Sequence, residues 1–585
     1  MDVRLDIDTL HAAYRDGSLT PEALIEALYA RMERESLEGA WIYRLSLHDA
    51  RSQARALAQL PGARELPLYG VPFAVKDNID VAGMPTTAGC PDYRYEPARS
   101  APSVTALLEA GALCLGKLAL DQFATGLVGS RSPYGACRNV FDPEVLSGGS
   151  SSGSALVVAS HQVSFALGTD TAGSGRVPAA LNNLVGLKPS VGLFSSDGVV
   201  PACASLDCVS VFALNVDDAA RVRDVMAGPG SSKSAPLAAG FRFGVPRALH
   251  EFGDEPAARA FEASVALLQE LGGVPVPLDF TPFLELGNQL YGPTVVERYW
   301  AVGSFIEQRP DSVLPVTRDI ILAGKQMGPA ETLAGFKQIG RLRLQCQRAL
   351  AELDLLVTPT IPRPYRLEED REQPRVINDR LGVYTRFANY LGSPVLAVPA
   401  GFRSDGLPFG LSLVGKPGED AALDALGARL HAASGAGAGK RRDPLPRSSL
   451  VGASEEQAAL VAVVGAHMRG LALNGQLTEL GGRHVETTRT AARYRLFVLP
   501  GTAPERPGLL QVREGGSSIE LEVWRLSWAA LGKLMARVPA PLAIGSIELA
   551  SGARVKGFLC EAHATEGALE ISALGGYRAY LAQQR

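Results

Sequence analysis

A serine between two glycines is the first feature of this chain that could do chemistry. The segment TDTAGSGRVPAA, residues 169–180, places Ser174 on a turn between Gly173 and Gly175, with Arg176 two residues on. A serine hydroxyl becomes an effective nucleophile when a neighbouring base takes its proton. No histidine stands near this serine in the sequence, so its base must come from another segment.

A second motif could bind phosphate. GALCLGK, residues 111–117, fits the pattern G-x-x-x-x-G-K, whose backbone amides cradle the phosphates of a nucleotide. That loop requires Ser or Thr at the next position to hold magnesium, and this chain has Leu118 there. The better interpretation is a buried strand that ends in a turn.

A third motif, GSSSG at residues 149–153, fits a nucleophile elbow centred on Ser151. An elbow needs a strong strand before it, and an acid and a histidine later in the chain. DPEVLSGG is a poor strand, and the available histidines lie in ordinary structural contexts: His161, His250 and His431. A Ser-His-Asp hydrolase is kept as a minor alternative.

Three longer blocks carry a more specific pattern. GVPFAVKDNIDVAGMPTTAG contains Lys76, LSGGSSSGSALVVAS contains Ser150, and FALGTDTAGSGRVPAALNNLVGLKP contains Ser174. In this order they resemble the amidase signature family, over roughly residues 10–430. The resemblance implies a serine hydrolase for linear amides that uses a Ser-Ser-Lys triad, without a cofactor.

The resemblance assigns a role to each member of the triad. Ser174 attacks the carbonyl, and its proton passes through Ser150 to Lys76. A lysine can act as a base only when it is neutral, and its ordinary pKa is about 10.4. Burial lowers this pKa because it disfavours the charged form. We therefore expect Lys76 to be buried and bonded to Ser150, which in this family follows a cis peptide bond.

The turn before Ser174 is expected to bind the oxyanion. Thr171, Ala172 and Gly173 offer consecutive backbone amides with little side-chain bulk. Arg176 could contact substrate or form a structural ion pair, and the nearness of Asp170 favours the structural role.

The substrate is inferred from further resemblance. LDQFATGLVGSRSPYG and DTAGSGRVPAALNNLVGLKPS are similar to segments of the allophanate hydrolases, a group within this family whose substrate is a small anion, the carboxylated urea allophanate. By this resemblance Tyr291 and Arg298 in LYGPTVVERYW hold its carboxylate, since the planar fork of arginine matches a carboxylate. The backbone at Gly126 is expected to contact the substrate from the opposite wall of the site.

The sequence leaves open which residues of that segment contact the carboxylate. The spacing between Tyr291 and Arg298 is one residue shorter than the resemblance leads us to expect, so Tyr299 is an alternative for the tyrosine. The whole segment could also be a solvated helix face on which Glu297 and Arg298 pair.

The resemblance gives the C-terminal domain a second reaction. Hydrolysis of the terminal amide releases ammonia and N-carboxycarbamate, and the domain promotes decarboxylation of the latter with the help of a histidine. His467, in VVGAHMRGLALNGQL, is the first candidate and His484 the second, although a lone histidine is often structural. No pair of histidines or cysteines has metal-ligand spacing, so no metal is expected.

Two other functions remain open. The chain could be a different amidase of the same family, acting on a biuret-type compound or serving as an amidotransferase subunit. It could also be a degenerate amidase that only binds partners, but Lys76, Ser150 and Ser174 are all present, which disfavours this.

Composition excludes several classes of protein. Charged residues make up 20% of the chain and hydrophobic residues 46%, as in an ordinary globular protein. A net charge of -4 disfavours nucleic acid as a partner, and no apolar run is long enough to span a membrane. Seven cysteines without a C-x-x-C pair indicate free thiols in a reducing cytoplasm. The resemblance also suggests a homodimer.

Length and periodicity indicate two domains, because 585 residues are too many for one core. TPEALIEALYARMERE predicts a helix capped by Thr20, and strands then alternate with helices. We expect an α/β domain at 1–440, with the family's mixed central sheet covered by helices on both faces and a helical insert at about 255–353. A linker at 441–455 leads to a small, mostly-β α+β domain at 456–585.

Overall fold

The chain forms two compact units. The computed structural model describes residues 3–228, 234–238, 240–250, 252–451, 458–501 and 505–584. The units are Met1–Leu450 and Val451–Arg585, so the division falls inside the linker expected at 441–455. Residues 452–455 of that linker and the first two residues of the expected C-terminal domain lie outside the described residues.

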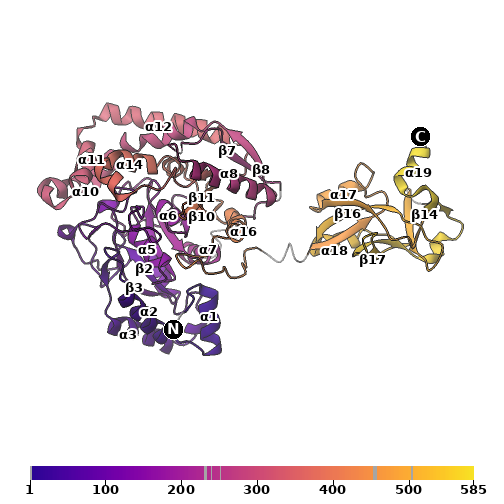
Figure 1. Cartoon of the computed structure of the whole chain (residues 1–585), viewed down its shortest axis with the longest axis horizontal. Coiled ribbons are helices and arrows are strands. Elements are labelled where there is room, and N and C mark those ends of the chain that lie inside the picture. The colour runs from indigo at the N-terminus through magenta and orange to yellow at the C-terminus, as the bar shows by residue number, and fades with distance from the viewer. Residues whose placement is uncertain are drawn as a thin grey trace. The chain divides into compact units, whose positions relative to one another are not determined.

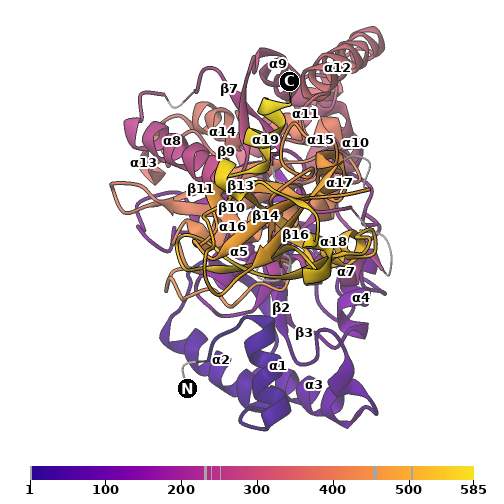
Figure 2. The same cartoon turned by 90° about the vertical axis from the view of Figure 1, so that its right-hand side faces the viewer.

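Unit 1 begins with three helices, α1 (Ile7–Asp16), α2 (Pro21–Arg34) and α3 (Leu47–Gln59). The Thr20 side chain accepts the amide of Ala23, and Pro21 occupies the first helical position, which confirms the helix predicted there. These helices lie at the opposite end of unit 1 from the long helices α10 (Val295–Gln308), α11 (Pro315–Gln326) and α12 (Pro329–Leu350) (Figure 1 and Figure 2).

An eleven-stranded mixed sheet forms the centre of unit 1. Strand β2 is parallel to β3 and β4, and β7 is parallel to β8 and β9, whereas the remaining neighbours are antiparallel. Strands β2, β3, β4, β6, β9 and β11 are buried at every position, so both faces are covered, as predicted. In spatial order the strands are β1 (Trp41–Arg44), β3 (Leu113–Leu118), β2 (Pro72–Lys76), β4 (Phe165–Asp170), β6 (Cys208–Ala213), β5 (Val185–Lys188), β10 (Val395–Phe402), β11 (Pro408–Val414), β9 (Leu355–Pro359), β7 (Arg242–Pro246) and β8 (Val274–Leu278).

The GALCLGK segment is a strand rather than a phosphate-binding loop. Lys117 lies within β3, and its Nζ is 3.1 Å from Asp77 Oδ1, with both side chains fully buried. The same ammonium donates to the carbonyl of Pro85 and to the hydroxyl of Thr86. Lys117 is therefore part of a buried ion pair in the core.

The region predicted as a helical insert is helical with one exception. It contains α8 (Glu255–Glu270), α9 (Thr281–Gly287), α10 (Val295–Gln308), α11 (Pro315–Gln326) and α12 (Pro329–Leu350). Between α8 and α9, strand β8 extends the sheet beside β7. Its sequence VPVPL contains two prolines, which a strand tolerates at the edge of a sheet because its outer amides have no partner there.

Shorter helices complete unit 1, and α5, α6, α7 and α16 among them pack against the central strands. Helices α5 and α6 follow directly after Ser151 and Arg176, so they begin beside the predicted triad. These helices are α4 (Pro102–Glu109), α5 (Ser152–Ala159), α6 (Val177–Leu181), α7 (Val216–Ala227), α13 (Leu367–Glu372), α14 (Pro374–Leu381), α15 (Arg386–Leu391) and α16 (Asp424–Ala433).

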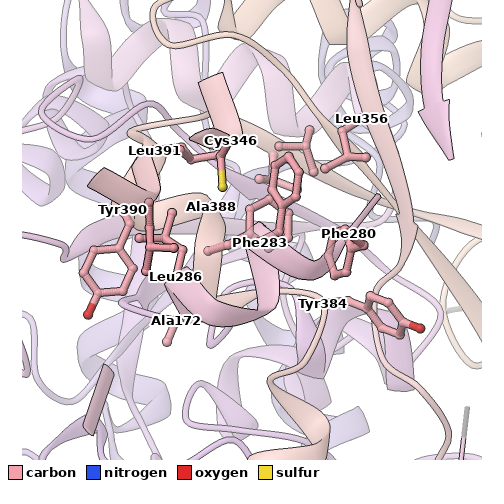
Figure 3. Close-up of a cluster of buried hydrophobic side chains, with 14 of the residues drawn as sticks. Ala172, Phe280, Phe283, Leu286, Cys346, Leu356, Tyr384, Ala388, Tyr390 and Leu391 are labelled. Atoms are coloured by element: carbon pink, nitrogen blue, oxygen red, sulfur yellow. The ribbon is translucent and has the colours of Figure 1, made fainter. Parts of the chain in front are cut away.

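A buried apolar cluster joins the helical region to the turn before Ser174. Ala172 belongs to the same cluster as Phe283 and Leu286 of α9 and Tyr390 of α15. Figure 3 shows Ala172 beneath Leu286 and Tyr390, at the edge of the packed aromatic side chains. The methyl group of Ala172 thus anchors this turn in a hydrophobic core.

Unit 2 is mostly β, as predicted. Its five-stranded sheet has the order β13-β16-β12-β18-β17, and its three-stranded sheet has the order β15-β14-β19. The strands are β12 (Ala458–Val463), β13 (Arg483–Arg489), β14 (Tyr494–Leu499), β15 (Arg506–Gln511), β16 (Glu520–Ser527), β17 (Leu542–Glu548), β18 (Arg554–Cys560) and β19 (Leu569–Glu570), and the helices are α17 (Asn474–Glu479), α18 (Trp528–Met535) and α19 (Tyr577–Gln583).

Two sequence expectations can be checked across both units. All seven cysteines are buried free thiols. Within the described ranges, every helix is too short or too polar to cross a bilayer.

Candidate active site

Lys76 is the last residue of β2, and its side chain is fully buried. Its Nζ donates to Ser150 Oγ at 2.8 Å and to Thr169 Oγ1 at 2.7 Å. Thr169 lies near the end of β4, which runs parallel to β2, so the carboxyl ends of the two strands meet here. The topology thereby brings a lysine and two hydroxyl groups together.

Burial lowers the pKa of Lys76 to about 7, because desolvation disfavours the ammonium. The charges of Asp121, Asp207 and Asp170 act in the opposite direction. Lys76 is therefore available as a neutral amine near neutral pH, which is the state that a general base requires.

Ser150 connects Lys76 to Ser174, the predicted nucleophile. Its hydroxyl donates to Ser174 Oγ at 3.0 Å, and the Gly149–Ser150 peptide bond is cis, as expected. Both serines are buried. Lys76, Ser150 and Ser174 thus form one continuous hydrogen-bonded chain along which a proton can pass.

Ser151 does not form the alternative nucleophile elbow. Its hydroxyl donates to the carbonyl of Thr169 at 3.1 Å, and the residue immediately precedes α5. The His431 ring contacts the carbonyl of Gly437, and burial lowers its pKa to about 4. Ser151 is thus bound to backbone, which removes the support for a Ser-His-Asp hydrolase.

Arg176 takes the structural role. Its Nε and Nη2 donate to the two carboxylate oxygens of Asp170 at 2.9 and 2.8 Å. Burial opposes ionisation of Asp170, but Arg176 outweighs it and holds the pKa of this carboxyl at about 2. The same two oxygens accept the amides of Gly173 and Gly175, so the pair fixes the turn around Ser174.

The three residues of the predicted oxyanion turn differ in whether their backbone amides are available to a ligand. Gly173 already donates its amide to Asp170, which leaves the amides of Thr171 and Ala172 as the candidates. Gly173 has φ +137°, and a Cβ there would collide with the hydroxyl of Thr385. The glycine is needed for conformation and close packing, while its amide helps to hold the turn.

Asp207 holds the other side of this turn. Its carboxylate accepts the hydroxyl of Thr171, and it also accepts the amides of Ala202 and Cys203 at 2.9 and 3.1 Å. Burial raises the pKa of Asp207 above its ordinary value. Two buried carboxylates, Asp170 and Asp207, therefore position the backbone on either side of Ala172.

Arg298 is a buried cation that contacts the loop around Thr125. Its side chain lies in α10, the residue is only 5% exposed, and its Nη1 donates to Thr125 Oγ1 at 3.0 Å. Among the described residues no carboxylate lies within ion-pair distance of it, although its charge acts on the buried Asp207, and its Nε makes no hydrogen bond. Glu297 instead accepts the amide and hydroxyl of Ser205, so the alternative surface pair with Arg298 does not form.

Tyr291 is connected through Asn378 to the loop that carries Gly126. Its hydroxyl accepts Asn378 Nδ2 at 2.8 Å, and Asn378 Oδ1 in turn accepts the amide of Leu127 at 2.8 Å. Tyr291 and Asn378 also line a cavity of about 290 Å³. Tyr299, the alternative tyrosine, donates to Glu307 instead.

Gly126 is required by its neighbour Asp121. A Cβ at this position would lie 2.5 Å from Asp121 Oδ2. The Asp121 carboxylate accepts the amides of Val128, Gly129 and Arg131, and thereby folds the loop that also carries Thr125. The structure thus brings the three predicted substrate residues around one loop held by Asp121.

In unit 2, His467 and His484 have different surroundings. His467 lines a cavity of about 40 Å³ together with Gln476, Arg506 and Arg537. Its ring stacks on Phe558 at 4.9 Å and its Nε2 is 3.1 Å from Gln476 Oε1, while burial lowers its pKa.

His484 lies on β13 and is only partly buried. Its Nε2 is 3.1 Å from Thr487 Oγ1, and its ring meets Trp524 edge-on. Since His467 faces a cavity that also contains arginines, it is the better placed of the two histidines for chemistry.

With this geometry described, the chain can be compared with known proteins. Residues 23–423 match the amidase family. The chain belongs to the amidase family. Residues 459–582 of this amidase match the allophanate hydrolase C-terminal domain.

Individual relatives of this amidase agree with both matches. It is 42% identical to urea amidolyase of Saccharomyces cerevisiae over 95% of this chain, but it spans about one third (32%) of that protein. Urea amidolyase of Lachancea kluyveri is 40% identical over 99% of this chain, which again spans about one third (33%) of the relative. A solved structure of Kluyveromyces lactis allophanate hydrolase is 39% identical over 99% of both chains, with a TM-score of 0.72.

Four polar residues of this amidase site escaped the sequence analysis: Asn78, Asp121, Thr169 and Asp207. Two of them had a readable signal. Asn78 and Thr169 are polar residues at the carboxyl ends of the apolar segments FAVKDN and FALGTD, where functional groups of parallel strands gather. The two aspartates lie in loops, and their sequence spacing does not indicate which amides they bind.

Proposed function

We propose that this chain hydrolyses allophanate to ammonia and N-carboxycarbamate, and that its second unit promotes decarboxylation of that product. Support comes from the matches to the amidase family and to the allophanate hydrolase C-terminal domain, and from the similarity to K. lactis allophanate hydrolase. The observation that carries the choice of substrate is the buried Arg298.

A buried guanidinium without a carboxylate partner favours an anionic ligand. An uncompensated buried charge is costly, and a bound carboxylate would compensate it with two parallel hydrogen bonds. Allophanate carries a carboxylate at one end and an amide at the other. With its carboxylate on Arg298, beside Tyr291 and the backbone at Gly126, its amide would extend toward Ser174.

The first half of the reaction forms an acyl-enzyme. Ser174 Oγ bonds to the amide carbon, while its proton moves to Ser150 and the proton of Ser150 moves to Lys76. The amides of Thr171 and Ala172 stabilise the oxyanion. The carbon–nitrogen bond then breaks, and the relay returns a proton to the leaving nitrogen, which departs as ammonia.

The second half consumes water. Lys76, again neutral, accepts a proton through Ser150 as water bonds to the acyl carbon. The ester bond to Ser174 then breaks, and the relay returns the proton to Ser174 Oγ. The product, N-carboxycarbamate, carries two carboxylates. Loss of carbon dioxide and uptake of one proton convert it to carbamate, which takes up a second proton and releases the second ammonia and a second carbon dioxide.

The cavity around His467 is our candidate for the decarboxylation. Arg506 and Arg537 in its lining suit a doubly anionic ligand. The negative charge of that ligand would favour the protonated form of His467, which could then supply the proton that replaces carbon dioxide on nitrogen. His484 is retained as the second candidate. The cytoplasmic location and the homodimer stay predictions.

The test is the amount of ammonia released per allophanate consumed by the full chain. Two ammonia from the native protein and none from Ser174→Ala support the proposal. Faster turnover of neutral biuret than of allophanate, or activity only with a partner chain, would instead favour another amidase of the family.

A further inference from the structure

We propose that Thr169 and Asn78 are positioning residues, which aim the Lys76 amine at Ser150 and set the pH range in which the serine relay works. The inference rests on the proposed function only in taking Lys76 as the base of that relay. It assigns a task to two buried side chains that lie outside the Ser-Ser-Lys triad.

The amine geometry requires a second partner for Lys76. A neutral amine has two hydrogens and one lone pair, and the lone pair must face Ser150 to receive its proton. Thr169 Oγ1 lies 2.7 Å from Nζ, and Ser150 Oγ lies 2.8 Å from it. An N–H bond to Thr169 therefore fixes the rotation of the amine and leaves its lone pair for Ser150.

Asn78 holds the Thr169 oxygen in this position. Its Nδ2 donates to Val200 O at 3.2 Å and to Thr169 Oγ1 at 3.3 Å. Since a carbonyl can only accept, Val200 decides which end of the amide faces Thr169. Val200 also donates its own amide to Asn78 O at 2.8 Å, which holds the two backbones together.

Thr169 affects the protonated state of Lys76 more than the neutral state. A hydrogen bond from an ammonium is stronger than one from an amine. Thr169 therefore partly offsets the desolvation of the ammonium. Without its oxygen, Lys76 would hold its proton less tightly and would also lose its orientation.

The charged groups that face Lys76 are already engaged elsewhere. Asp121 accepts loop amides, Asp170 pairs with Arg176, and Asp207 accepts Thr171. In the neighbouring strand, Lys117 pairs with Asp77. Within the described residues no carboxylate forms an ion pair with Lys76, so neutral oxygens supply its direct contacts.

Two assays separate this inference from the choice of substrate. The first is the pH dependence of kcat/KM for allophanate. The second is the pH dependence of inactivation by phenylmethylsulfonyl fluoride. In that reaction Ser174 Oγ bonds to sulfur, fluoride leaves, and the serine proton passes to the relay. The reagent reports the nucleophile without any need for allophanate.

Two variants should move the acid limb, the part of each profile where the rate falls as the pH decreases. Each variant should move it in the same direction in both assays, and the two variants should move it in opposite directions. Thr169→Val should lower the plateau rate at least tenfold and shift the limb to lower pH. Asn78→Asp places a carboxylate beside Thr169 and Lys76, and should shift the limb to higher pH. Thr169→Ser keeps the oxygen and should stay within twofold of the native rate.

Thr358→Val is the matched control. Thr358 is also a fully buried strand threonine, but its hydroxyl has no hydrogen-bond partner among the described residues. This variant should leave both profiles unchanged.

The inference is overturned if Thr169→Val lowers the rate but leaves the acid limb at the native pH. It is also overturned if Asn78→Asp does not shift the acid limb to higher pH. If Thr169→Val fails to fold, Asn78→Asp carries the test, because a packing role does not predict an upward shift. Normal shifts in sulfonylation together with no turnover of allophanate would reject the proposed substrate and retain the positioning role.

Discussion

Asp170 and Arg176 form a buried ion pair on the turn that carries Ser174. Arg176 Nη2 lies 2.8 Å from Asp170 Oδ1, and both side chains are fully buried. The carboxylate also accepts the amides on both sides of Ser174. One charged pair therefore fixes the backbone on which Ser174 is presented to Ser150.

We expect Arg176→Met to destabilise the fold by about 3–5 kcal/mol, because it leaves Asp170 buried without its partner. Urea unfolding of the two proteins measures the difference. Arg375→Met is the control, since Arg375 forms an exposed pair with Asp319 and should cost less than about 1 kcal/mol. Equal losses in the two variants would contradict a structural role for Arg176.

The pKa of Lys76, about 7, predicts how activity depends on pH. Below pH 7 the lysine holds a proton and cannot accept one from Ser150, so kcat/KM should fall as the pH decreases. Above pH 7 the rate should reach a plateau. A pH profile of the native protein checks this, and Lys76→Met should abolish activity throughout. A flat profile between pH 6 and 8 would show that Lys76 is not the base.

The same group predicts a change in stability with pH. The pKa of Lys76 is lower in the folded chain than its ordinary value of about 10.4, so between pH 7 and about 10.4 the unfolded chain binds more protons. The free energy of unfolding should therefore rise with pH across this window, by a few kcal/mol for one buried lysine. Lys76→Met lacks the group, so the rise should appear in the difference between the two proteins. No change in that difference would mean that the lysine is solvated in the folded state.

Arg298 should determine selectivity for an anion. Arg298→Gln should reduce kcat/KM for allophanate about 100-fold, ~3 kcal/mol, since a buried charge partner is lost. Biuret has an amide in place of the carboxylate, and its turnover should change little. Arg259→Gln, which removes an exposed guanidinium paired with Glu255 in α8, is the control and should leave the ratio of the two substrates unaltered. An equal fall for both substrates would instead indicate damage to the triad.

The triad was predictable because its residues occur in long blocks with a fixed order. Lys76, Ser150 and Ser174 come together as those blocks imply. The residues that hold them were harder to find, because Asp207 and Asp121 act on backbone amides through loop geometry. A lone aspartate in a sequence does not reveal which amides it will accept.

In the fold, too, features that follow from local sequence patterns were predicted, whereas features that depend on tertiary contacts were not. Alternating strands and helices predicted the α/β class of unit 1, and a series of strand-like segments predicted the β-rich unit 2. Strand β8 was missed because its prolines are typical of turns, and they are compatible with a strand only at the sheet edge. Packing of Ala172 against α9 likewise depends on residues more than a hundred positions away.

The two histidines of unit 2 allow a paired test of decarboxylation. His467 lines a cavity with Arg506 and Arg537, whereas His484 contacts Trp524 and Thr487 on β13. His467→Asn should leave the first ammonia unchanged and delay the second several-fold, because unit 1 still forms N-carboxycarbamate. His484→Asn should show no delay. Coupled ammonia detection during the first turnovers resolves the two phases. A delay in His484→Asn alone would transfer the role to that residue, and simultaneous release in both variants would place decarboxylation outside this cavity.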